Sequence, residues 1–84
     1  LGLGMSGIIL LVDPSPSQRL VLKSRLAAAH YEVTALADGP AALAALRARR
    51  ADLVLLGSDT GEDWPVALLR DMRADPGLAA VPAI

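Results

Sequence analysis

Apolar residues along this chain gather in short runs that alternate with longer segments in which every third or fourth residue is apolar. The clearest run is Ile8 to Val12, which is apolar throughout and is stopped by Asp13 and Pro14. A run of this kind is typical of a strand that is buried on both faces. Further strands are predicted at residues 31–36 and 52–56, and residues 81–84 are expected to begin a fourth.

Helices are predicted between these strands from their caps and apolar stripes. Ser15 and Pro16 supply an N-cap and a first-turn proline for a helix that runs to about Ala29. Asp38 is the expected cap of the second helix, and Asp63 that of a third, which starts near residues 64–65. The apolar stripe of the third helix follows the i, i+3, i+4, i+7 pattern at Pro65, Leu68, Leu69 and Met72.

Regular alternation of strand and helix predicts an α/β domain with a parallel sheet and helices on both faces. In such sheets the functional residues lie beyond the carboxyl ends of the strands. This edge is predicted to carry residues 13–15 after the first strand and residues 57–59 after the third.

Composition and charge narrow the possible functions. The 84 residues are enough for one small domain, and the apolar fraction of 54% excludes a disordered chain. The net charge of −1, with scattered basic residues, gives no sign of nucleic-acid binding. Without cysteine there is no disulfide or thiolate metal site, and no apolar run approaches the ~20 residues that span a membrane. Residues 1–4 are interpreted as an addition before a natural start at Met5.

Four segments resemble the CheY-like receiver domains of bacterial two-component response regulators: LLVDPSPSQRLVLKSRLAAAHYEV, ADGPAALAAL, ADLVLLGSD and RADPGLAAVPAI. The resemblance covers residues 8–84, and the first segment looks most like the receiver of PleD-type regulators, in which a diguanylate cyclase output domain follows. It implies a flavodoxin-like, doubly wound fold for residues 5–84, cut short after the start of the fourth strand.

The resemblance also implies where a phosphorylation pocket would lie. Receiver domains place an acidic pair after the first strand and a phospho-accepting aspartate after the third, and these carboxylates hold Mg²⁺. Asp13 matches the first acidic position, but Pro14 stands at the second and Gly57 at the acceptor position. Proline offers no metal ligand and glycine no nucleophile, so neither a metal, a cofactor nor catalysis is expected in this chain.

Two alternatives remain open at this point. Asp59, or Ser58, could replace the missing acceptor in an active phospho-receiver. The chain could instead be an unrelated α/β domain that binds a small ligand, although its first turn lacks the glycine-rich spacing of such domains.

Several other residues have a functional and a structural interpretation. Trp64 could anchor a partner protein or cover the base of the loop before it. His30 is interpreted as a helix C-terminal residue, and Arg47, Arg49 and Arg50 as a solvated helix end rather than a phosphate site.

The function expected from these observations is a cytoplasmic protein-interaction module in phosphorelay signalling that is not switched by phosphorylation. Its partners would be another receiver, a kinase or its own output domain, with no nucleic acid and no membrane. Self-association is also expected, because a sheet that is covered incompletely leaves an apolar patch and an open edge.

Overall fold

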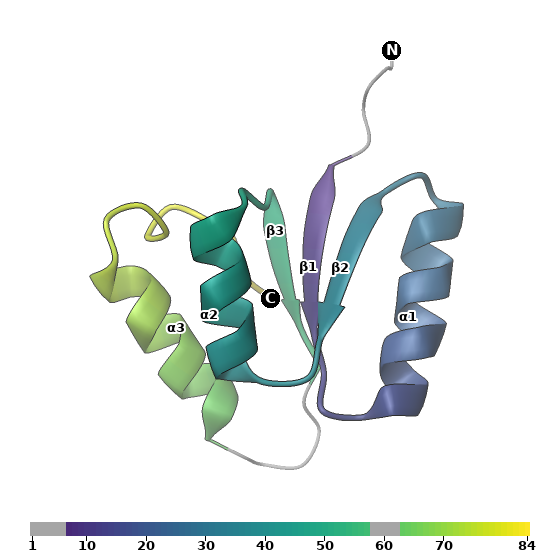
Figure 1. Ribbon diagram of the computed structural model, residues 1–84, viewed down its shortest axis with the longest axis horizontal. Helices are drawn as coiled ribbons and strands as arrows, with labels where there is room; N and C mark the ends of the chain where they lie inside the picture. The colour runs from purple at the N-terminus through teal and green to yellow at the C-terminus, as the bar shows by residue number, and fades with distance from the viewer. Residues whose placement is uncertain (1–6, 58–62) are drawn as a thin grey trace.

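The computed structural model describes residues 7–57 and 63–84 as a parallel sheet with helices on both sides (Figure 1). The sheet has the strand order β2-β1-β3, so β1 lies in the middle. Register pairs Ile8 with Glu32 and Ile9 with Leu53. The strands are β1 (Ile8–Val12), β2 (Glu32–Leu36) and β3 (Leu53–Leu56), and the helices are α1 (Pro16–Ala28), α2 (Gly39–Ala48) and α3 (Trp64–Ala74). The predicted α/β fold is therefore confirmed.

Two of the three predicted helix caps are present. The Ser15 hydroxyl accepts a hydrogen bond from the Gln18 N–H at 3.3 Å, and the Asp38 carboxylate accepts one from the Ala41 N–H at 2.8 Å. The prediction for Asp63 is wrong in its chemistry, since the residue holds the N-cap position but its side chain makes no capping hydrogen bond. Its backbone is already helical, whereas a capping side chain needs an extended backbone to reach the next turn.

The C-terminus of α1 is closed by a backbone motif that involves His30. The Tyr31 N–H donates to the Leu26 carbonyl at 3.1 Å, and the His30 N–H donates to the Ala27 carbonyl at 3.0 Å. This pair of bonds is the Schellman arrangement, which requires a left-handed residue after the helix. His30 supplies it with a φ of 72°, a conformation that costs a non-glycine residue energy. The structural interpretation of His30 as a helix C-terminal residue is confirmed.

The main hydrophobic core lies on one face of the sheet, beneath α2 and α3. Even-numbered residues of the strands, such as Leu10, Val12 and Val54, pack there against Leu68 and Met72. The opposite face carries α1, which packs on β2 and β1 (Figure 1). No residue of α1 is fully buried, whereas α2 and α3 each bury apolar side chains. The two faces of the sheet are therefore covered unequally by the described helices.

The predicted fourth strand is present only as a single bridge between Val54 and Ala83. The Val54 N–H donates to the Pro82 carbonyl at 2.9 Å, and the Ile84 N–H donates to the Val54 carbonyl at 3.0 Å. Pro82 has no N–H to add to the ladder, which limits pairing on its side. The pairing is nevertheless parallel, and it extends the sheet beyond β3 as the sequence predicted.

Two further interpretations of the sequence concern the start of the chain and membrane-spanning segments. The proposed start at Met5 and the residues before it lie outside the described residues. Within 7–57 and 63–84, none of the helices has the length and apolar character needed to cross a membrane.

Candidate functional site at the carboxyl edge of the sheet

Asp13 and Gly57 lie side by side where β1 and β3 end. Val12 pairs with Leu56 in the parallel register, and the Gly57 N–H donates to the Val12 carbonyl at 2.8 Å. On the other side, the Asp13 N–H donates to the Leu36 carbonyl at the end of β2 at 2.9 Å. These backbone hydrogen bonds to β2 and β3 fix the end of β1. They therefore also fix the direction in which the Asp13 side chain leaves the strand.

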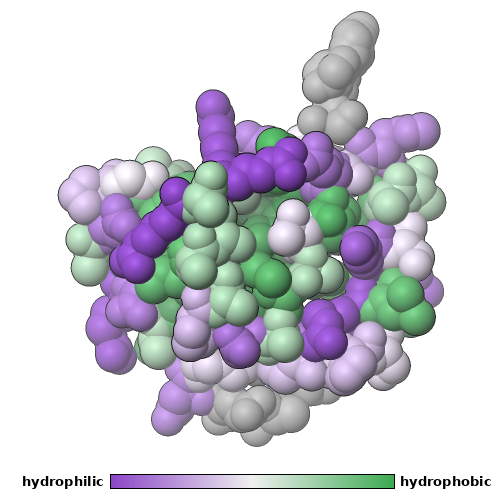
Figure 2. Space-filling model, viewed as in Figure 1, coloured by the Kyte–Doolittle hydropathy of each residue, from purple (hydrophilic) through white to green (hydrophobic). Residues whose placement is uncertain are grey.

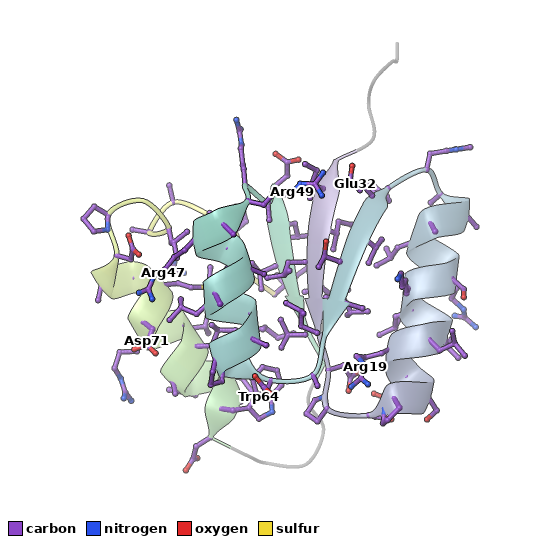
Figure 3. All side chains as sticks on the ribbon, viewed as in Figure 1. Arg19, Glu32, Arg47, Arg49, Trp64 and Asp71 are labelled. Atoms are coloured by element: carbon purple, nitrogen blue, oxygen red, sulfur yellow. The ribbon has the colours of Figure 1, made fainter. Side chains whose placement is uncertain are left out.

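The Asp13 side chain is buried although it is charged, with 2% of the residue exposed. Its Oδ1 accepts a hydrogen bond from the Ser15 N–H at 2.9 Å. Its backbone carbonyl accepts one from the guanidinium of Arg19 at 2.7 Å, and Figure 3 shows Arg19 reaching from α1 toward this edge. The second carboxylate oxygen, Oδ2, is buried and has no hydrogen-bond partner among residues 7–57 and 63–84. A buried polar atom without a partner is costly, so its position needs a structural reason.

Gly57 gives that reason, because its missing side chain leaves the room that Asp13 occupies. A Cβ atom placed on Gly57 would lie 2.2 Å from Asp13 Oδ2, 2.8 Å from its Cγ and 3.1 Å from its Cβ. Gly57 does not have the left-handed φ that would by itself require glycine. The carboxyl group of Asp13 thus lies in the space where a side chain at position 57 would begin.

The other predicted residues of this edge contribute little to its chemistry. Pro14 is exposed and follows Asp13 in the turn before α1, where its ring cannot ligate a metal ion. Ser58 and Asp59, the alternative acceptors, lie outside the described residues. Within the described chain, no three Asp, Glu or His side chains gather in a way that could hold a metal ion.

The residues described at this edge do not fit the Mg²⁺ that the receiver resemblance implies. They supply one carboxylate, Asp13, in place of three, and one of its oxygens is already used by Ser15. Mg²⁺ binds six oxygen ligands and usually retains several waters, whereas Asp13 is almost closed to solvent.

Trp64 borders the edge from the start of α3, where it packs against the hydrophobic core. Its ring lies 4.0 Å from the position that a Cβ on Gly39 would take, so it covers the beginning of α2 (Figure 3). The indole N–H is buried and has no hydrogen-bond partner in the part of the chain that the structure describes. The ring is half-buried, and most of the loop before it lies outside the described residues. Both interpretations of Trp64, as a cover for the base of that loop and as an anchor for a partner protein, therefore stay predictions.

The three arginines near the end of α2 are each paired with an acidic residue; Arg49 and Arg50 lie at the opposite, amino edge of the sheet, and Arg47 lies beside α3 (Figure 3). Arg47 pairs with Asp75 at 3.3 Å, Arg49 with Glu32, and Arg50 with Asp52 at 3.8 Å. Figure 3 shows Arg49 and Glu32 together above the sheet, away from Trp64 and Arg19. These pairs are exposed, in keeping with a solvated helix end.

Comparison with known proteins finds likenesses only at the level of solved structures. No protein-family model and no curated protein sequence matches the chain. The receiver domain of a signal transduction histidine kinase from Syntrophus aciditrophicus is 31% identical, with a TM-score of 0.83 over 93% of this chain and 59% of that one. The N-terminal domain of a response regulator receiver protein from Methanoculleus marisnigri JR1 is 30% identical, with a TM-score of 0.84 over 92% of this chain and 63% of that one.

A third likeness concerns the fold alone. The pseudo-receiver domain of the CikA protein is 22% identical, with a TM-score of 0.74 over 94% of this chain and 83% of that one. The chain spans about three fifths of the two receiver domains that are more similar in sequence. The strand order, the placement of the helices and these likenesses together show the fold of the CheY-like receiver domains.

Proposed function

We propose that this chain is a receiver module that is not phosphorylated on aspartate and that regulates through contacts with other proteins. The observation that carries the proposal is the burial of Asp13 against Gly57. A receiver needs an exposed acceptor carboxylate after the third strand and a cation beside it. Here the residue that aligns with the acceptor has no side chain, and the one aligned carboxylate is buried against it.

The remaining parts of the proposal rest on the receiver resemblance. The module belongs in the cytoplasm, catalyses no reaction itself, and docks on another receiver, a kinase or an output domain. A diguanylate cyclase is the output domain that the PleD-like first segment favours. An unrelated small-ligand domain is not favoured, since two solved structures that are 31% and 30% identical to the chain are receiver domains.

Incubation with Mg²⁺ and a small phosphodonor, followed by intact-mass measurement, tests this function. We expect no added phosphoryl group under conditions that label an ordinary receiver in the same tube. The variant Asp59→Asn separates the alternative, because a mass gain that disappears in this variant would assign Asp59 as the acceptor. Any phosphoryl group on an aspartate of the chain would overturn the proposal.

We further propose that a second copy of the chain binds the exposed apolar side chains of α1, since Ile9 and Leu11 of β1 are already buried. Leu20 and Val21 of α1 are 67% and 49% exposed, although both are apolar. Val21 and Leu22 also line a groove of about 370 Å³ together with Ser17 and Gln18. Exposed apolar surface of this kind is typical of contact sites.

Light scattering behind a sizing column tests this association at micromolar concentration. We expect an assembly larger than a monomer, and we expect Leu20→Lys to shift it toward the monomer. Val66→Lys is the matched control, since Val66 on α3 is 59% exposed but lies on the opposite side of the sheet. A monomeric wild-type chain, or an equal shift in both variants, would contradict the proposed surface.

A further inference from the structure

The position of Asp13 raises a question that the missing acceptor alone does not answer: why residue 57 is a glycine. Many side chains other than aspartate would remove the acceptor, and most would suit the end of a strand better than glycine does. The backbone of Gly57 is not left-handed, so its conformation does not demand glycine. Glycine is required here because of the Asp13 side chain, since a Cβ at position 57 would lie 2.2 Å from Asp13 Oδ2.

The Asp13 carboxyl group cannot easily turn away from this space. Its Oδ1 is held by the Ser15 N–H at 2.9 Å, at the turn that leads into α1. The backbone on both sides is held as well, by Leu36 through the Asp13 N–H and by Arg19 through the Asp13 carbonyl. A side chain at position 57 would therefore break the bond to Ser15 or displace the end of β3.

We propose that Asp13 and Gly57 are a matched pair, in which the Asp13 carboxyl group fills the space of the absent side chain and holds the carboxyl edge of the sheet in one closed conformation. This inference deepens the proposed function, because it makes the edge a fixed element rather than a switch that has merely lost its acceptor. It predicts that the edge accommodates one carboxyl group at a time, on position 13 or on position 57.

Gly7, at the opposite edge of the sheet, shows how Gly57 differs from an ordinary glycine beside an aspartate. Gly7 also faces an aspartate, but a Cβ on Gly7 would lie 3.6 Å from Asp52 Oδ2, an ordinary contact. Its φ, like that of Gly57, is not left-handed. Replacing a glycine by alanine at such a position normally stabilises a protein slightly, because the unfolded chain loses freedom. Gly7→Ala is therefore the matched control for Gly57→Ala.

A thermal-unfolding cycle on the 84-residue chain at one protein concentration tests the pair. We expect Gly57→Ala to lower the melting temperature by roughly 5–10 °C, whereas Gly7→Ala leaves it unchanged or raises it. In an Asp13→Gly background we expect the sign to reverse, so that Gly57→Ala raises the melting temperature by roughly 2–6 °C. Equal effects of Gly57→Ala in the two backgrounds would overturn the pair.

Hydrogen exchange at the Ser15 amide gives a second readout that does not depend on unfolding of the whole chain. We expect this amide to exchange more than tenfold faster in Gly57→Ala, because the displaced carboxyl group no longer accepts its bond, and unchanged in Gly7→Ala. An unchanged Ser15 amide in a folded Gly57→Ala variant would contradict the inference. If Gly57→Ala does not fold, Asp13→Gly with Gly57→Ala must still fold, and its failure to do so would overturn the pair. Neither readout uses a phosphodonor, so this inference and the proposed function can fail separately.

Discussion

The sheet places an aspartate against a glycine at each of its two edges, and the two pairs differ in almost every physical respect. At the amino edge, Asp52 Oδ2 accepts a hydrogen bond from the Ile8 N–H at 2.8 Å and has room beside Gly7. At the carboxyl edge, Asp13 Oδ2 has no partner among the described residues and lies in the space of a side chain at Gly57. Asp52 is exposed and pairs with Arg50, whereas Asp13 is buried.

The difference indicates which edge carries a constraint beyond stability. The amino edge follows the usual pattern of surfaces, with ion pairs in water and hydrophilic side chains along the rim of the molecule (Figure 2). The carboxyl edge keeps a buried carboxylate oxygen without a partner, which a fold does not need and which costs free energy. Residues that break the rules of stable packing gather at functional sites.

The largest expected effect comes from restoring a carboxylate at position 57. Gly57→Asp adds a Cβ inside the Asp13 carboxyl group and a second charge beside it, so we expect a loss of about 3 kcal/mol in the free energy of unfolding. Urea titration measures it. The transposed variant, Asp13→Gly with Gly57→Asp, should recover much of this loss. A Gly57→Asp chain as stable as the wild type would remove the contrast between the edges.

A smaller effect is expected from removing the buried charge. Asp13→Asn keeps an oxygen for the Ser15 N–H while it removes the unpaired negative charge, so we expect a gain of about 1 kcal/mol. Asp52→Asn is the control at the amino edge, where the carboxylate is exposed and we expect a change below about 0.5 kcal/mol. If both changes have the same effect in urea titration, burial does not distinguish the two aspartates.

Among the described residues, His30 at the amino edge is the one non-glycine residue with a left-handed backbone. Because His30 has a φ of 72°, His30→Gly should stabilise the chain by roughly 0.5–1 kcal/mol. His30→Ala keeps the Cβ in the same left-handed conformation and should give no such gain. A comparison of melting temperatures decides this, and an equal gain from alanine would show that the imidazole, rather than the backbone, carries the cost.

The smallest effect is expected at the ion pair between Arg49 and Glu32. Both side chains are more than 40% exposed, at 61% and 49%, so Arg49→Ala should change the free energy of unfolding by less than about 0.5 kcal/mol. Adding salt should make this effect smaller still, because salt screens charges that are exposed to solvent. A loss above 1 kcal/mol in urea titration would show that the amino edge also carries a constraint.

Much of the fold could be predicted from the sequence because local signals and burial agree. The apolar run at Ile8–Val12 and the caps at Ser15 and Asp38 each fix an element by short-range chemistry. The fourth strand is predicted in the right place, but only a bridge forms between Ala83 and Val54. Pro82 has no N–H to donate to β3, which limits the pairing. The Asp63 cap failed because the backbone of this residue is already helical, which the residue type alone does not reveal.

The site could be predicted in part. Asp13 and Gly57 were placed at the same edge by the parallel arrangement of the strands, and the register of Val12 with Leu56 makes them neighbours on one face. Their contact was missed because the sequence does not reveal which way a side chain turns at a strand end. The missed signal was the glycine itself, at a strand end where no turn requires one.

The central claim, a carboxyl edge that is fixed in one conformation, is tested most directly by the amide NMR signals of Ser15 and Gly57. These amides donate to Asp13 Oδ1 and to the Val12 carbonyl, so they report on both sides of the pair. The account predicts that their chemical shifts and exchange rates stay unchanged when Mg²⁺ and a small phosphodonor are added together. A saturable shift of both signals would contradict it, because it would show that the edge binds these ligands and changes conformation.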